Sequence, residues 1–139
     1  MKTQISCLLV ILLIVACAKK ATLPPEASVF HNNRGVVYLT EGDLERAEFS
    51  FKTALELNPN YAEAYNNLGI VHKTRGELDK AIGMFQKALS IDEDYASARN
   101  HLGATYLAQG KTDEALKELK KAEKGAPTAA DIKYNLGVA

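Results

Sequence analysis

The 139-residue chain has no tryptophan, four prolines and nine glycines, so few residues in it oppose a helix. It also has no net charge, because 17 basic residues balance 17 acidic ones. That balance lacks the basic surplus of a typical nucleic-acid-binding protein. What remains is rich in Ala, Leu, Lys and Glu, which enter helices at little cost. We therefore expect an all-α protein with one soluble domain and no nucleic-acid partner.

Motifs of catalysis and of metal binding are missing as well. The sequence contains no glycine-rich phosphate loop, no nucleophile elbow and no paired acid motif. Its three histidines, His31, His72 and His101, stand far apart and have no carboxylates at a ligand spacing. We expect no enzymatic activity, no cofactor and no metal site.

An apolar run extends from Ile5 to Ala18 and is interrupted only by Ser6. It is shorter than the roughly 20 residues of a membrane-spanning helix and fits the roughly 7–15 of a secretory signal core. Residues 14–17 read Ile-Val-Ala-Cys, which resembles a bacterial lipobox. The resemblance implies a signal peptide at 1–16 and acylation of Cys17. The alternative is an ordinary signal peptide, or a short anchor, with a chance cysteine.

Residues 17–27 are interpreted as the lipidated cysteine and an extended tether, because this segment holds two of the four prolines and no helical periodicity. The lipobox resemblance implies a lipid-anchored protein of the bacterial cell envelope. Ala18 stands where an aspartate commonly retains lipoproteins in the inner membrane. In a Gram-negative cell we therefore expect the periplasmic face of the outer membrane.

The rest of the chain repeats itself every 34 residues. The matching positions include Gly35, Gly69, Gly103 and Gly137, then Gly42, Gly76 and Gly110, and then Phe51, Phe85 and Leu119. This pattern resembles the tetratricopeptide repeat (TPR), which has two antiparallel helices per 34 residues. The resemblance implies an alpha-alpha superhelix, a TPR solenoid. Its three full helix pairs would span 28–61, 62–95 and 96–129, and the start of a fourth would span 130–139.

Helix boundaries inside each unit are marked by turn and capping residues. Gly42 follows the first helix of its unit and can adopt the positive φ that ends it, and Asp43 then starts the second helix. Asn60 stands before the next first helix, three residues ahead of Glu63. This spacing predicts a capping box at that helix start.

Packing inside the units follows from apolar spacing. Phe51, Ala54 and Leu55 lie at i, i+3 and i+4, which predicts an amphipathic second helix. Gly69 falls inside a first helix, where glycine costs about 1 kcal/mol relative to alanine. We expect a close helix crossing there, with Ala81 as the small residue that faces it.

First helices should line the concave side of such a superhelix, and their faces carry asparagine at unit spacing. An amide offers both a donor and an acceptor, so a row of amides can pair with an extended peptide backbone. The predicted peptide-binding residues are Asn32, Asn33, Asn66, Asn67, Ile70, Lys73, Asn100 and His101. We expect Asn67 and Asn100 to face solvent in the free protein. The alternative is that these amides only bond neighbouring helices.

TPR domains that hold acidic carboxyl-terminal peptides use several lysines and an arginine. Here Lys73 is the one obvious cation of the groove, so we do not expect such a peptide. We expect a membrane-anchored scaffold for a protein or an extended peptide, and it resembles the repeat lipoproteins of type IV pilus or secretin assembly. The partner's identity and the oligomeric state stay open.

The sequence stops at Ala139, inside the first helix of the fourth unit. Two alternatives follow: the N-terminal docking module of a longer, truncated enzyme, or self-association at the uncapped C-terminal end. The opposite end departs from the pattern, because Arg34 stands where Leu68 and Leu102 stand in later units. A terminal unit has one neighbour only, so a polar replacement is tolerable there.

Overall fold

The computed structural model describes residues 25–125 and 130–139, and in these residues it consists of helices without a strand. The helices are α2 (Pro25–Thr40), α3 (Leu44–Leu57), α4 (Ala62–Thr74), α5 (Leu78–Ile91), α6 (Ala96–Ala108), α7 (Thr112–Gly125) and α8 (Ala130–Val138). The all-α prediction is confirmed. None of these helices is both long and apolar enough to cross a bilayer.

The predicted signal peptide and Cys17 lie outside the described residues. The sequence predicts a tether that continues to Ala27, but α2 begins at Pro25, so that prediction is wrong for its last three residues. Proline suits the first turn of a helix, because the amide hydrogen it lacks would have no partner there.

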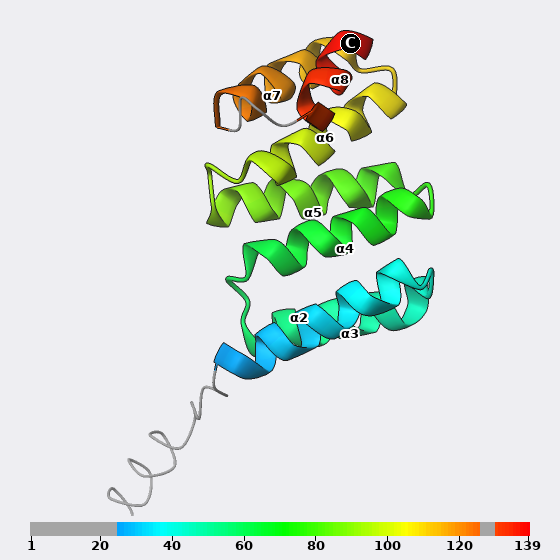
Figure 1. Ribbon diagram of the computed structural model, residues 1–139, viewed down its shortest axis with the longest axis vertical. Helices are drawn as coiled ribbons and strands as arrows, with labels where there is room; N and C mark the ends of the chain where they lie inside the picture. The colour runs from blue at the N-terminus through cyan, green and yellow to red at the C-terminus, as the bar shows by residue number, and fades with distance from the viewer. Residues whose placement is uncertain (1–24, 126–129) are drawn as a thin grey trace, which may run out of the picture.

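Successive helices pair as α2 with α3, α4 with α5 and α6 with α7, and the pairs stack in chain order before α8 (Figure 1). We call α2, α4, α6 and α8 the first helices, and α3, α5 and α7 the second helices. Cα atoms of neighbouring first helices approach within 8 Å of each other, whereas no Cα atoms of successive second helices do so in the described part. The first helices are therefore the more closely spaced row, and they line the concave side of the superhelix.

The turns inside each unit follow the predicted glycines. Gly42, Gly76 and Gly110 have φ of 79°, 78° and 75°. Asp43 is the N-cap of α3, and its carboxylate accepts a hydrogen bond from a backbone N–H of the first turn. The expected capping box at Asn60 is wrong, because the N-cap of α4 is Tyr61 and the Asn60 N–H donates to Asn58 Oδ1 at 3.1 Å. Asn60 thus belongs to the turn.

The core is built between units, where each second helix packs on the following first helix. Ala47 and Phe51 of α3 form one buried cluster with Leu68 and Val71 of α4. A second cluster joins α5 to α6 and consists of Ala81, Phe85 and Leu102. Because a unit completes its core with its neighbour, burial continues along the stack.

The helix crossing predicted at Gly69 is present, but its partner is different. A Cβ atom on Gly69 would lie 2.6 Å from Cε1 of Phe85, so the residue that faces the glycine is this aromatic ring and not Ala81. Gly35 faces Phe51 in the same way. The two glycines leave space for a flat aromatic ring of the second helix. The close approach of the two helices therefore does not need a small residue on the second helix as well.

Candidate peptide-binding groove

Hydrogen bonds join the side chains of neighbouring first helices across the concave side. Three pairs, each separated by 35 residues, link a donor in one unit to an amide oxygen in the preceding unit. They are Asn67 Nδ2 to Asn32 Oδ1 (3.0 Å), His101 Nδ1 to Asn66 Oδ1 (2.9 Å) and Asn135 Nδ2 to Asn100 Oδ1 (2.8 Å). We call these side chains the amide network.

Part of the network forms a continuous chain of bonds with one direction. His101 donates to Asn66, Asn66 Nδ2 donates to Asn67 Oδ1 at 3.5 Å, and Asn67 donates to Asn32. Asn32 Nδ2 then donates to the Glu63 carboxylate at 3.0 Å. An amide oxygen can only accept, so Nδ1 of His101 carries the hydrogen.

The asparagines of this network are buried. Asn32 is 0% exposed, Asn66 4%, and Asn67 and Asn100 9% each. The expectation that Asn67 and Asn100 face solvent is wrong, and the alternative, in which the amides bond neighbouring helices, describes them. The physical reason is that an unpaired buried amide costs about 1–3 kcal/mol, so burial between helices requires internal partners. Asn33 differs, because the described residues contain no unit before its own, and it stays exposed.

His101 belongs to the network and is held neutral by its surroundings. Burial is the largest cause that lowers the pKa of His101, the nearby ammonium of Lys73 lowers it further, and Asp131 opposes them. The His101 ring also lies 5.5 Å from the ring of Phe85, centroid to centroid. A neutral imidazole at this place donates one hydrogen bond, as the asparagine amide does in the other two pairs.

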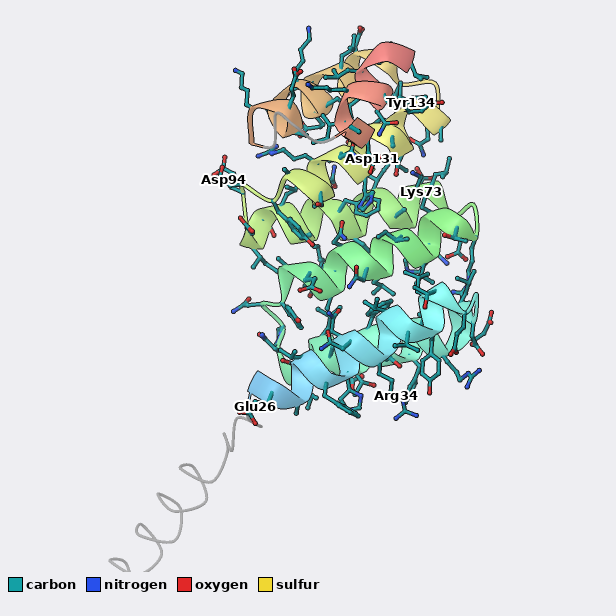
Figure 2. The ribbon with its side chains drawn as sticks, viewed as in Figure 1. Glu26, Arg34, Lys73, Asp94, Asp131 and Tyr134 are labelled. Atoms are coloured by element: carbon teal, nitrogen blue, oxygen red, sulfur yellow. The ribbon has the colours of Figure 1, made fainter. Side chains whose placement is uncertain are left out.

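Lys73 is a cation of the groove without a partner among the described residues. Its side chain is half-buried, and no hydrogen bond or ion pair joins its ammonium group to another of the described residues. Burial lowers the pKa of Lys73. Figure 2 shows Lys73 on α4, and Asp131 and Tyr134 on α8. Ile70, one turn before Lys73, is half-buried and packs against the cluster around Phe85.

The structure thus divides the predicted site residues into two groups. Five lie in the amide network: Asn32, Asn66, Asn67, Asn100 and His101. Of the other three, Asn33 is exposed, and Ile70 and Lys73 are half-buried. Whether any of them contacts a ligand stays a prediction. Within the described part of the chain, no three His, Cys, Asp or Glu side chains are grouped to hold a metal ion.

Two family models described as tetratricopeptide repeat match the chain, one at residues 26–94 and the other at 73–136. Together with the 34-residue period and the stacked helix pairs, these matches show that the chain belongs to the tetratricopeptide-repeat family. No curated protein matches the chain.

Solved structures share this fold. The first TPR of Spaghetti (RPAP3), bound to the HSP90 peptide SRMEEVD, is 16% identical, with a TM-score of 0.80, over 86% of this chain and 94% of that one. The Arabidopsis OM64 TPR domain is 20% identical, with a TM-score of 0.79, over 82% of this chain and 94% of the domain. MamA is 27% identical, with a TM-score of 0.74, over 83% of this chain and 67% of MamA.

Proposed function

We propose that this protein is a lipid-anchored scaffold of the bacterial envelope, which holds a protein or an extended peptide in its concave groove while an envelope complex assembles. The observation that carries the proposal is the half-buried ammonium of Lys73, which has no partner among the described residues. A partly desolvated cation without a partner is stabilised by a carbonyl or carboxylate oxygen from another molecule.

The amide network supports this function by fixing the shape of the groove. Its hydrogen bonds tie α2 to α4, α4 to α6 and α6 to α8, so the spacing of the first helices is set before a ligand arrives. A preformed groove reduces the ordering cost of binding. The ligand then contacts side chains that the network leaves free, among them Val36, Ile70 and Lys73.

The TPR domain of Spaghetti, bound to an HSP90 peptide, supports a peptide as the ligand class. The acidic peptide SRMEEVD itself is not the ligand that we expect. Lys73 is the one obvious cation of the groove. Val36 and Ser97, which are uncharged, stand at two positions where other TPR domains place cations that bind acidic tails. One free ammonium suits a ligand that offers a single carbonyl or carboxylate among apolar side chains.

The anchor is tested by replacing Cys17 with Ser, which removes the proposed lipid acceptor. Each buried methylene of an acyl chain contributes about 0.8 kcal/mol, so loss of the chains should release the protein from the membrane or leave it as an unprocessed precursor. Membrane fractionation and the mass of the mature protein measure this. A correctly processed Cys17→Ser protein that stays with the membrane would contradict the lipid anchor.

The groove is tested by calorimetric titration with the partner that a pulldown with the lipidated protein identifies. Lys73→Gln should weaken binding about tenfold or more, because a hydrogen bond to a charged group contributes about 1.5–3 kcal/mol. The matched control is Lys117→Gln with Lys121→Gln on α7, a second helix, and it should change the affinity little. Unchanged affinity in Lys73→Gln, or a large loss in the control, would move the binding site away from the concave side.

A further inference from the structure

The first helix of the array exposes a face that later first helices bury. In α4 and α6 this face packs against the preceding second helix, and it consists of Ala64, Leu68 and Val71, and of Ala98, Leu102 and Thr105, none more than 4% exposed. The equivalent residues of α2 are Phe30, Arg34 and Val37. Phe30 is 60% exposed, Val37 is 52% exposed, and Arg34 is exposed too.

Phe49 of α3 extends this surface, because it is 72% exposed and lines a shallow hollow together with Arg34. We call Phe30, Arg34, Val37 and Phe49 the end face. The three α2 residues share one side of the helix by their i, i+4 and i+7 spacing. Figure 2 shows Arg34 at the end of the stack where the chain enters α2, away from Tyr134 at the other end.

Arg34 gives the end face one uncompensated positive charge. Its Nε donates to the hydroxyl of Tyr38 at 3.0 Å, and its guanidinium carbon lies 5.5 Å from the centre of that ring. No carboxylate among the described residues forms an ion pair with it. The neighbouring Arg46, in contrast, is paired with Asp43 at 2.6 Å.

We propose that the end face docks on the surface of the lipid bilayer and thereby fixes the direction in which the array points away from the membrane. This inference rests on the lipid anchor proposed above. Pro25 follows Cys17 by eight positions in the sequence. Since an extended chain spans at most about 3.3–3.6 Å per residue, α2 starts within about 30 Å of the lipidated cysteine. The end face is thus the end of the array that is held nearest the bilayer.

The residues of the end face fit a bilayer better than they fit another helix. Where α4 and α6 meet a preceding helix, they place Ala64 and Ala98 at the position of Phe30, and leucine at the position of Arg34. A helix with the apolar packing face of α3 or α5 would bury an arginine without supplying a carboxylate partner, which is strongly unfavourable. At a bilayer surface the phenyl rings enter the acyl boundary, while the arginine stem lies along it and the guanidinium reaches a phosphate.

The absence of tryptophan from the chain allows a direct test. Phe49→Trp places the chain's single tryptophan on the end face, where its fluorescence can be excited selectively over that of tyrosine. Tyr134→Trp places one at the opposite end, where Tyr134 is 73% exposed. Each processed, full-length variant is reconstituted in phosphatidylethanolamine and phosphatidylglycerol vesicles that contain brominated acyl chains. The bromine should quench the fluorescence of the Phe49→Trp variant and shift its emission to the blue, and should leave the emission of the Tyr134→Trp variant unchanged.

Two further measurements separate the end face from the anchor. Adding Phe30→Ser and Val37→Ser to Phe49→Trp should reduce the docked fraction about tenfold or more, while the protein still floats with the vesicles. An unquenched Phe49→Trp protein that floats would overturn the docking and leave the anchor intact. A protein that does not float would contradict the anchor. In that case quenching of the Phe49→Trp variant by added vesicles still supports the end face, and its absence overturns it.

A second copy of the chain gives a different result. End-to-end contact would shift the emission of the Phe49→Trp variant to the blue as the protein concentration rises, without quenching by brominated lipid. That outcome would assign the end face to self-association and overturn bilayer docking. Quenching that survives the serine replacements at Phe30 and Val37 would overturn it as well.

Discussion

Replacing Gly69 by alanine adds one methyl group at a place where the structure has no room for it. The new Cβ would lie 2.6, 2.8 and 2.9 Å from three carbons of the Phe85 ring. Non-bonded carbons are comfortable at about 3.5–4.0 Å, so the ring would have to move by roughly 1 Å. Phe85 is 0% exposed, so a moved ring would press on the side chains packed around it, among them Ala81 and Leu102.

Two opposite effects determine the size of the change. Overpacking a core costs about 1–3 kcal/mol, and three short contacts with a buried ring favour the upper part of that range. Alanine in a helix recovers about 1 kcal/mol relative to glycine. We expect Gly69→Ala to lower the free energy of unfolding by about 1–2 kcal/mol. Gly69→Leu, with a larger side chain, should cost at least as much.

Gly83 provides a matched control inside the neighbouring helix. It lies within α5, and a Cβ there would meet nothing within 4 Å. Gly83→Ala keeps the gain in helix propensity without the clash, so it should stabilise the protein by about 0.5–1 kcal/mol. Urea unfolding followed by circular dichroism measures both variants. A stabilised Gly69→Ala, or equal effects of the two substitutions, would refute the close contact with Phe85.

Two further predictions concern the amide network. Asn67→Ala leaves the side-chain oxygen of Asn32, a residue that is 0% exposed, without its hydrogen-bond donor. Thermal melting should therefore show that the free energy of unfolding falls by about 1–3 kcal/mol. The control, Asn33→Ala at an exposed position, should change it by less than about 0.5 kcal/mol. Because burial lowers the pKa of His101, the unfolded chain takes up a proton more readily than the folded one, and stability should fall as the pH drops below the ordinary histidine pKa of about 6.5. His101→Asn cannot titrate and should flatten this part of the stability profile measured by urea unfolding at several pH values. A profile identical to that of the unaltered protein would contradict the role of His101.

The helical architecture could be predicted from the sequence because its causes are local. A period of 34 residues fixes the number of helix pairs. A glycine such as Gly42, which adopts a positive φ, ends the first helix of its unit. The apolar spacing around Phe51 likewise identified a residue that is fully buried. These features depend on neighbours within a few positions of the chain.

The polar residues could not be assigned in the same way, because their partners lie one unit away. Asn67 and Asn33 occupy equivalent positions, yet Asn67 bonds Asn32 and is buried, while Asn33 is exposed because no unit precedes its own in the described residues. The sequence alone does not reveal whether an amide faces a neighbouring helix or the solvent. The exposure of Phe30 could not be predicted for the same reason, since it depends on whether another helix packs on that side of α2, and none of the described helices does.

The spacing of the network bonds also bears on how such an array can grow. Each of the three bonds to an amide oxygen of the preceding unit joins residues 35 apart, one more than the period. The two middle units therefore each carry an acceptor for the unit after them and a donor for the unit before them. An in-frame duplication of one unit in the gene would therefore supply both halves of the new bonds at once. His101 in the place of an asparagine shows that a different donor can serve without loss of the pairing. The array can thus be lengthened by copying alone, and each inserted copy arrives already compatible with both of its neighbours.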